Sequence, residues 1–126
     1  AAEALRRVVV EAVRRARGPA CEVHVVLTGD DELRRLNRTY RNLDRPTDVL
    51  SFADGDTLPT GTVLLGEIVV SLDAARRQGA DFGHGELREL EELVLHGTLH
   101  LLGHDHERDG GEMEAIELDL REEILK

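Results

Sequence analysis

The chain has 126 residues, a length that fits one domain spanning residues 1–126. Its formal net charge of −10 argues against an extended nucleic-acid interface, because phosphate binding needs clustered Lys and Arg. The single cysteine, Cys21, excludes an internal disulfide framework, and no stretch approaches the roughly 20 apolar residues of a membrane span. We therefore expect a cytoplasmic protein with no membrane partner.

The charge is unevenly distributed along the chain. Residues 1–45 carry ten arginines against seven acidic residues, a balance of +3, whereas residues 46–126 carry −13. An anionic substrate would therefore be met mainly by the first third of the chain. The same arginines also fit an exposed helix face, so both interpretations stay open. The candidates for substrate contact are Arg34, Arg35, Arg38, Arg41 and Arg45.

The first half of the chain predicts two helices and a strand. Apolar residues recur at helical spacing in residues 3–17, and Gly18 with the proline after it ends that helix. Residues 21–28 are rich in β-branched side chains and predict a strand. An aspartate such as Asp30 can then cap a second helix that runs to about Tyr40.

The second half predicts two further strands and three helices. The strands span residues 47–52 and 63–70, with a loop rich in Gly, Pro and Asp between them. Helices are predicted over residues 71–78, 86–102 and 112–125, and a glycine-containing break precedes the second of them.

This order of elements predicts an α+β (mixed α/β) fold. We expect a small mixed sheet of about four strands, covered on one face by helices, with the helix over residues 86–102 at the centre. Leu87 is expected on the buried face of that helix. His84 follows Gly83 in the loop before it and either caps the start of the helix or approaches the functional site, with capping favoured. His24 alternates with strand hydrophobes and is interpreted as structural.

Four of the six histidines fall within eleven residues of one another. His96 and His100 are four residues apart, so on a helix they share one face. Gly103 lets the chain leave the helix and turn back, which can present a further histidine to the same ion. The spacing favours His106 as the third ligand, with His104 as its competitor. Three imidazoles with an open position are typical of a catalytic zinc.

One position argues against a protease. Zinc proteases that share this histidine spacing carry a glutamate, their general base, directly after the first histidine. Here Gly97 occupies that position and cannot transfer a proton. Phosphodiester cleavage instead asks for a cation that stabilises charge on the phosphoryl oxygens, a task that suits an arginine.

The sequence resembles the YbeY family, bacterial metal-dependent endoribonucleases of ribosomal RNA maturation. Residues 96–106 resemble the family's HGxLHLxGxDH signature, with His104 where many members carry Tyr. Residues 36–41 (LNRTYR) and 46–52 (PTDVLSF) are similar to its second hallmark, and residues 65–70 are similar to its LGDIV strand, with Glu67 in place of Asp. The family opens with a strand ahead of the first helix, whereas this chain starts at the helix.

The resemblance implies that His96, His100 and His106 bind one zinc ion and that Arg41 is the catalytic arginine. It further implies cleavage of single-stranded RNA, a role at the 3′ end of small-subunit ribosomal RNA, and a part in ribosome quality control. Ribosomal or assembly proteins are additional candidate partners. Three histidines also suit nickel, copper or cobalt, so the identity of the ion stays open.

Two other functions remain possible from the sequence. One is a metallopeptidase or amidase, which the glycine at position 97 disfavours. The other is a non-catalytic module for ribosome assembly that is stabilised by its metal. Asp48 and Ser51, polar residues in the hallmark strand, could line the cleft or could fix the turn after Pro46. They are therefore not assigned a catalytic role.

Overall fold

A computed structural model of the protein describes residues 2–16, 18–103, 117–119, 121–122 and 125. None of the helices in these ranges is long and apolar enough to span a bilayer. The elements, in chain order, are α1 (Ala2–Arg15), β1 (Cys21–Thr28), α2 (Asp30–Arg41), β2 (Val49–Ala53), β3 (Val63–Ser71), α3 (Leu72–Phe82) and α4 (Gly85–Leu101). Residues 117–119 and 121–122 are also helical, within the segment predicted as the last helix.

The three strands form one mixed sheet in the order β1-β3-β2. β1 runs parallel to β3, with Val25 opposite Ile68, and a register shift follows Glu22. β2 runs antiparallel to β3, with Ser51 also opposite Ile68. The central strand, β3, is therefore paired along both edges, and its apolar residues face the core on both sides of the sheet.

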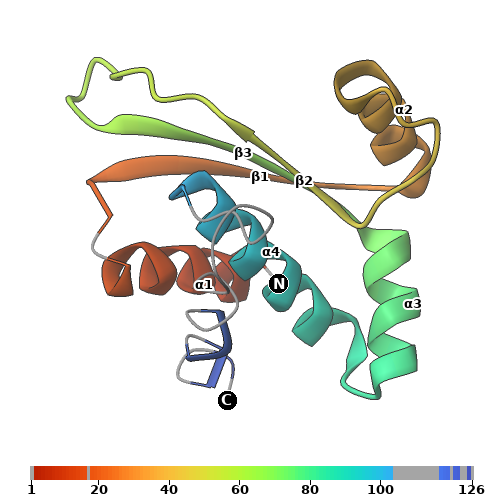
Figure 1. Cartoon of the computed structure of the whole chain (residues 1–126). Coiled ribbons are helices and arrows are strands. Elements are labelled where there is room, and N and C mark those ends of the chain that lie inside the picture. The colour runs from red at the N-terminus through yellow and green to blue at the C-terminus, as the bar shows by residue number, and fades with distance from the viewer. Residues whose placement is uncertain (1, 17, 104–116, 120, 123–124, 126) are drawn as a thin grey trace.

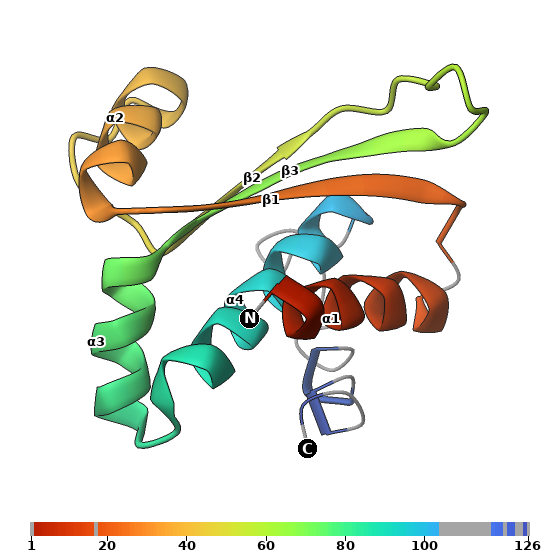
Figure 2. The same cartoon turned by 180° about the vertical axis from the view of Figure 1, so that it is seen from behind.

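Helices cover the two faces of the sheet unequally. α1 and α4 lie together on one face, whereas α2 lies over the other face near one end, and α3 continues from β3 at that end (Figures 1 and 2). The alternation of β3 divides the core accordingly, because neighbouring strand residues point to opposite faces. Ile68 and Val70 pack into the cluster formed with α1 and α4. Val69 packs with Leu33 and Leu50 in a smaller cluster under α2.

The predicted α+β class is confirmed, but the predicted count of about four strands is wrong for the described part of the chain, which contains three. The loop after β2 contributes only an isolated bridge between Thr57 and Val63, because its Gly and Pro residues interrupt regular pairing. Leu87, predicted to be buried, is 44% exposed. Helix α3 extends past residue 78 to Phe82.

Gly79 explains why α3 does not end where the sequence predicted a break. A Cβ at this position would lie 2.4 Å from the carbonyl oxygen of Gly85. The glycine is therefore required by the close approach of the α3–α4 turn, and not by a helix end. The helix ends instead at Gly83, whose φ of 76° is left-handed.

A polar network joins the start of α2 to the start of α3. The Ser71 hydroxyl accepts a hydrogen bond from the Ala74 backbone N–H and donates one to Asp30, at 2.7 Å. Arg77 donates to the other Asp30 oxygen at 2.7 Å, and the Asp30 backbone N–H donates to Asp73. The hydrogen bonds from Arg77 and Ser71 lower the pKa of Asp30, against the opposing effect of burial. These contacts fix α2, and with it Arg41, relative to β3.

We expect Asp30→Asn to lower the free energy of unfolding at neutral pH by about 1–2 kcal/mol, the scale of a charge-assisted hydrogen bond. Because the folded pKa of Asp30 is depressed, its contribution is present above the unfolded value of roughly 4 and is lost as the pH falls through the folded value. The difference between wild type and variant should therefore shrink in acid. Urea denaturation at several pH values measures it, and a pH-independent difference would contradict the assignment.

Candidate active site

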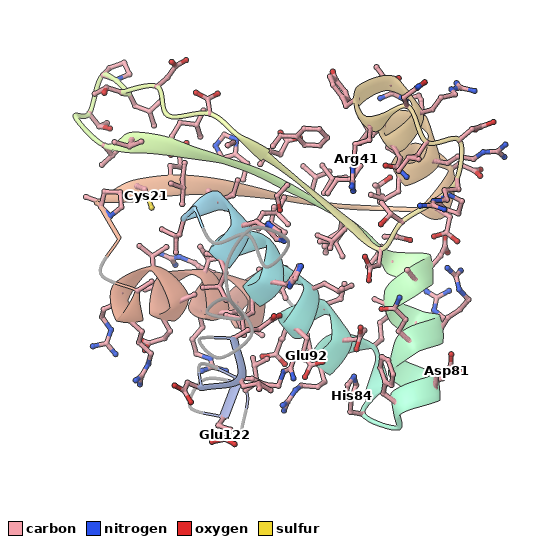
Figure 3. All side chains as sticks on the ribbon, in the orientation of Figure 1. Cys21, Arg41, Asp81, His84, Glu92 and Glu122 are labelled. Atoms are coloured by element: carbon pink, nitrogen blue, oxygen red, sulfur yellow. The ribbon has the colours of Figure 1, made fainter. Side chains whose placement is uncertain are left out.

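One cleft of about 780 Å³ gathers residues from α2, β2, α4 and the helical segment around residue 117. Its polar lining combines imidazoles, carboxylates and guanidinium groups. Arg41 reaches it from the end of α2, while Glu92 lies on α4 (Figure 3). The charged and imidazole side chains that line the cleft are Arg41, Asp48, Glu89, Glu92, His96, His100, Glu117 and Arg121.

The structure brings His96 and His100 together as their spacing predicted. Both are half-buried on α4, and their Nε2 atoms lie 3.0 Å apart. Two nitrogens that bind one tetrahedral zinc at about 2.0–2.1 Å lie roughly 3.3 Å from each other. The two imidazoles therefore already converge on one point at nearly the spacing of a shared ion. The donor set fits a zinc-like ion.

Glu117 supports the first of these histidines from the opposite side of the ring. Its Oε1 lies 3.1 Å from His96 Nδ1, so the carboxylate orients the imidazole and leaves Nε2 directed at His100. This hydrogen bond raises the pKa of His96, and the negative charges of Glu117 and Asp48 act in the same direction. Burial and the Arg121 guanidinium oppose the increase.

The third predicted ligand, His106, and its competitor His104 lie outside the described residues. Arg41, the predicted catalytic arginine, is the last residue of α2 and is exposed. Asn42 ends the helix in a left-handed conformation, with φ of 59°, as asparagine tolerates well. Within the described residues Arg41 forms no hydrogen bond or ion pair, so its guanidinium is available to the cleft that it lines.

Asp48 and Ser51 both line the cleft, and each also has a structural contact. Asp48 accepts a long hydrogen bond from Gln78, at 3.4 Å. The Ser51 hydroxyl donates to the Gly97 carbonyl at 3.3 Å and thereby ties β2 to α4. Both residues therefore line the cleft, as one interpretation predicted, and their side-chain contacts are to α3 and α4 and not to the turn after Pro46.

Gly97 has a packing role that explains its position between the two histidines. A Cβ here would lie 2.8 Å from Ile68 Cγ2 and 3.0 Å from Ser51 Oγ. The glycine therefore lets α4 approach the sheet closely and sets the depth of His96 and His100 in the cleft. A glutamate at this position would collide with β2 and β3.

We expect Gly97→Ala to destabilise the protein by about 1–3 kcal/mol through overpacking. The sign is informative, because Gly→Ala in an uncrowded helix interior should instead stabilise by about 1 kcal/mol. Chemical denaturation followed by circular dichroism measures the effect. A variant more stable than wild type would show that α4 does not need this close approach.

Comparisons with known proteins identify the family of this chain. The family model of endoribonuclease YbeY matches residues 1–126. The chain belongs to the YbeY family. The endoribonuclease YbeY of Koribacter versatilis is 47% identical over 114 residues, which cover 88% of this chain and 70% of that protein. That of Aquifex aeolicus is 46% identical over 104 residues, covering 82% of this chain and 68% of its own length.

A solved structure supports the fold of this YbeY chain. The solution structure of TM1509 from Thermotoga maritima matches with a TM-score of 0.65 and 34% sequence identity. The match covers 97% of this chain and 79% of that one. The resemblance to the YbeY family that the sequence motifs indicated is thereby confirmed, together with the α+β class.

Sequence reasoning missed three carboxylates of this YbeY site: Glu89, Glu92 and Glu117. The first two follow the spacing of the histidines, since positions 89, 92, 96 and 100 form one stripe along α4. That stripe was a usable signal. Glu117 directly follows a predicted buried position of the last helix, but only the tertiary fold brings it to His96.

His84 is not the cap that the sequence favoured but contacts a residue of the cleft, and His24 lies at the surface. His84 precedes α4 at the N-cap position, but its side chain makes no capping hydrogen bond, and its Nε2 lies 2.7 Å from Glu89 Oε1. His84, Glu89 and Glu92 together offer ligand atoms that all lie within 4.8 Å of one another, a possible metal-binding group. His24 is half exposed and contacts Glu22 on β1, so it is not a core residue.

Proposed function

We propose that this protein is a metal-dependent endoribonuclease that hydrolyses phosphodiester bonds of single-stranded RNA. The observation that carries the proposal is the convergence of His96 Nε2 and His100 Nε2 in the cleft that Arg41 also lines. An ion site beside an exposed guanidinium suits a phosphodiester, whose negative oxygens both groups can contact. The relatives are named as endoribonucleases, which supports the same reaction.

His96, His100 and the predicted ligand His106 would hold the ion. When bound, a zinc-like ion supplies Lewis acidity toward a phosphoryl oxygen. Glu117 holds the His96 ring through Nδ1 and so keeps Nε2 in place for coordination. Arg41 pairs with a phosphate of the substrate and stabilises the charge that develops on its oxygens. Its planar fork of donors permits two parallel hydrogen bonds.

Gly97 is the observation that disfavours a peptidase or amidase. Zinc proteases with this histidine spacing carry their general base at the position of Gly97. Here that position has no space for a side chain, because the side chains of Ile68 and Ser51 lie where its Cβ would be. The phosphodiester reaction does not require a carboxylate at that position. The nuclease is therefore preferred over the peptidase.

The wider assignment follows the family resemblance. It comprises a single domain over residues 1–126, zinc as the ion, maturation of the 3′ end of small-subunit ribosomal RNA, and action in the cytoplasm. Ribosomal or assembly proteins are the proposed additional partners. A partner is chemically reasonable, because the net charge of −10 gives the chain alone a weak attraction for RNA.

Cleavage of an end-labelled single-stranded RNA tests the proposal. We expect zinc-loaded protein to cut the RNA and chelator-stripped protein to leave it intact, with activity restored when zinc returns. If the loaded protein leaves RNA intact although it binds one zinc ion tightly, the isolated chain is not a nuclease. The non-catalytic assembly module would then become the better description.

We expect Glu117→Gln to weaken zinc binding by about 10–100-fold, the usual cost of losing a carboxylate that orients a histidine ligand. Competition with a chromogenic chelator measures the affinity. Glu122→Gln is the matched control, because Glu122 lies on the same helical segment and is exposed. Equal zinc affinity in Glu117→Gln and in this control would show that Glu117 does not orient His96.

A further inference from the structure

A second group of ligand-type side chains lies next to the histidine pair along α4, and two of its three members, Glu89 and Glu92, line the cleft. His84 belongs to the turn before α4, and Glu89 and Glu92 belong to α4 itself. Figure 3 shows His84 and Glu92 near the α3–α4 turn, apart from Arg41 at the end of α2. One imidazole nitrogen and two carboxylate oxygens lie within 4.8 Å of one another. Ligands on opposite sides of one divalent ion, each at about 2.0–2.3 Å, are separated by a similar distance.

The burial of Glu89 is the feature that most needs explanation. Glu89 is only 4% exposed, and a carboxylate in such a position is costly unless a positive charge compensates it. Its contact is His84 Nε2, at 2.7 Å. A neutral imidazole can donate one hydrogen bond but carries no full charge. A divalent cation between the two groups would supply the missing compensation.

Glu92 is the third member and has competing partners. Its Oε1 lies 3.4 Å from Arg88 Nε and 3.2 Å from Arg121 Nε. Neither contact is short, and the Arg121 contact lacks the geometry of a hydrogen bond, since that buried Nε has no hydrogen-bond partner in the described structure. Glu92 can therefore turn one oxygen to an ion without the loss of a strong hydrogen bond.

The charge of the cleft supplies a reason for a second ion. Among the described residues the cleft is lined by four carboxylates, Asp48, Glu89, Glu92 and Glu117, against two guanidinium groups, Arg41 and Arg121. One divalent ion at the histidines would only cancel this excess of negative charge. A polyanionic substrate is attracted by a net positive cleft, which a second divalent ion would create.

We propose that His84, Glu89 and Glu92 bind a second divalent cation, adjacent to the ion held by His96 and His100. One imidazole and two carboxylates form a mixed nitrogen and oxygen set that suits Mn²⁺. The cation site does not depend on catalysis. The role of the second cation in attracting RNA rests on the proposed nuclease function.

Mn²⁺ binding to the full chain tests the proposal. The chain is first loaded with one equivalent of Zn²⁺, and free Mn²⁺ is then followed by its electron paramagnetic resonance signal. We expect one Mn²⁺ per chain in the wild type and at least a tenfold weaker affinity in His84→Ala. Because His84→Ala leaves the buried Glu89 without its imidazole partner, circular dichroism must first show that the variant keeps the wild-type fold. Asp81→Asn, which removes an exposed carboxylate of the neighbouring α3, should bind Mn²⁺ as the wild type does.

The proposal is overturned if the wild type binds no Mn²⁺, or if the wild type and His84→Ala bind it with equal affinity. His100→Ala separates this site from the histidine site. Mn²⁺ binding that survives in His100→Ala and weakens in His84→Ala supports the second site. The reverse pattern would place Mn²⁺ at the histidines and overturn it. Because the measurement needs no RNA, an inactive protein that binds Mn²⁺ at His84 would contradict the nuclease function alone.

Discussion

Replacing His100 by Ala is expected to abolish tight zinc binding and to reduce RNA cleavage by more than about 100-fold. The loss should exceed the roughly 10–100-fold cost of removing a residue that only hydrogen-bonds to a metal ligand. The reason is geometric. His100 Nε2 lies 3.0 Å from His96 Nε2, and both nitrogens belong to one stripe of α4. Without the second nitrogen, His96 alone provides the described part of the site. Isothermal titration with zinc and cleavage of end-labelled RNA measure the two effects.

The control for this experiment is another histidine of the same chain. His24 is half exposed on β1 and contacts Glu22, and it does not line the cleft. His24→Ala should therefore bind zinc and cleave RNA as the wild type does. The assignment fails if His100→Ala retains wild-type zinc affinity, or if both variants lose activity equally. His100 is only partly buried, so His100→Ala should keep the fold. Circular dichroism of both variants checks this and distinguishes loss of the site from loss of the fold.

The sequence was informative about the fold wherever periodicity was strong. In α1 the buried residues Leu5, Val8 and Ala12 follow the 3.6-residue period directly, so this helix could be predicted with its buried face. The three described strands were also predicted, within a few residues of their observed bounds. These features depend on local patterns that one segment contains by itself.

Features that depend on a second segment could not be predicted in this way. Glycine often marks the end of a helix, yet Gly79 lies inside α3, where it is needed because the backbone of Gly85 approaches it closely. Leu87 fits the apolar stripe of α4, yet it is 44% exposed. In each case the outcome depends on how neighbouring elements pack against the helix, which its own apolar pattern does not specify.

The same distinction applies to the site. His96 and His100 could be paired from their spacing, since one helix turn fixes their relation. Arg41 and Glu117 belong to other elements, so only the packing of α2 and of the segment around residue 117 brings them to the cleft. The family resemblance indicated Arg41 before the fold did. No sequence pattern indicated Glu117, because a carboxylate on an amphipathic helix is ordinarily exposed.

Arg41 lines the cleft, and the described residues include no structural partner that would explain it. It is exposed, it lines the cleft, and among the described side chains it forms no hydrogen bond or ion pair. Two of the other arginines of α2 differ in this respect. Arg34 pairs with Asp44 at 2.9 Å, and Arg35 pairs with Glu32 on the surface of the helix. Arg41 differs from these two in having no described partner, and it differs from Arg38 in lining the cleft.

We expect Arg41→Ala to reduce the rate of RNA cleavage by about 10²–10³-fold, the scale of removing one group that stabilises developing charge. Arg41→Lys should remain at least about tenfold below wild type, because an ammonium cannot make the paired hydrogen bonds of a guanidinium. Zinc affinity should not change in either variant. Single-turnover cleavage of the end-labelled RNA, alongside zinc titration, separates these effects.

Arg38→Ala is the matched control, because Arg38 is exposed one turn earlier on α2 and does not line the cleft. If RNA were attracted only by the positive charge of α2, Arg38→Ala and Arg41→Ala would lose activity to a similar extent, and Arg41→Lys would recover it. A direct contact with the scissile phosphate predicts the opposite pattern: Arg38→Ala stays near wild type and lysine does not replace Arg41. The three variants together therefore decide whether α2 contributes a general field or one specific guanidinium.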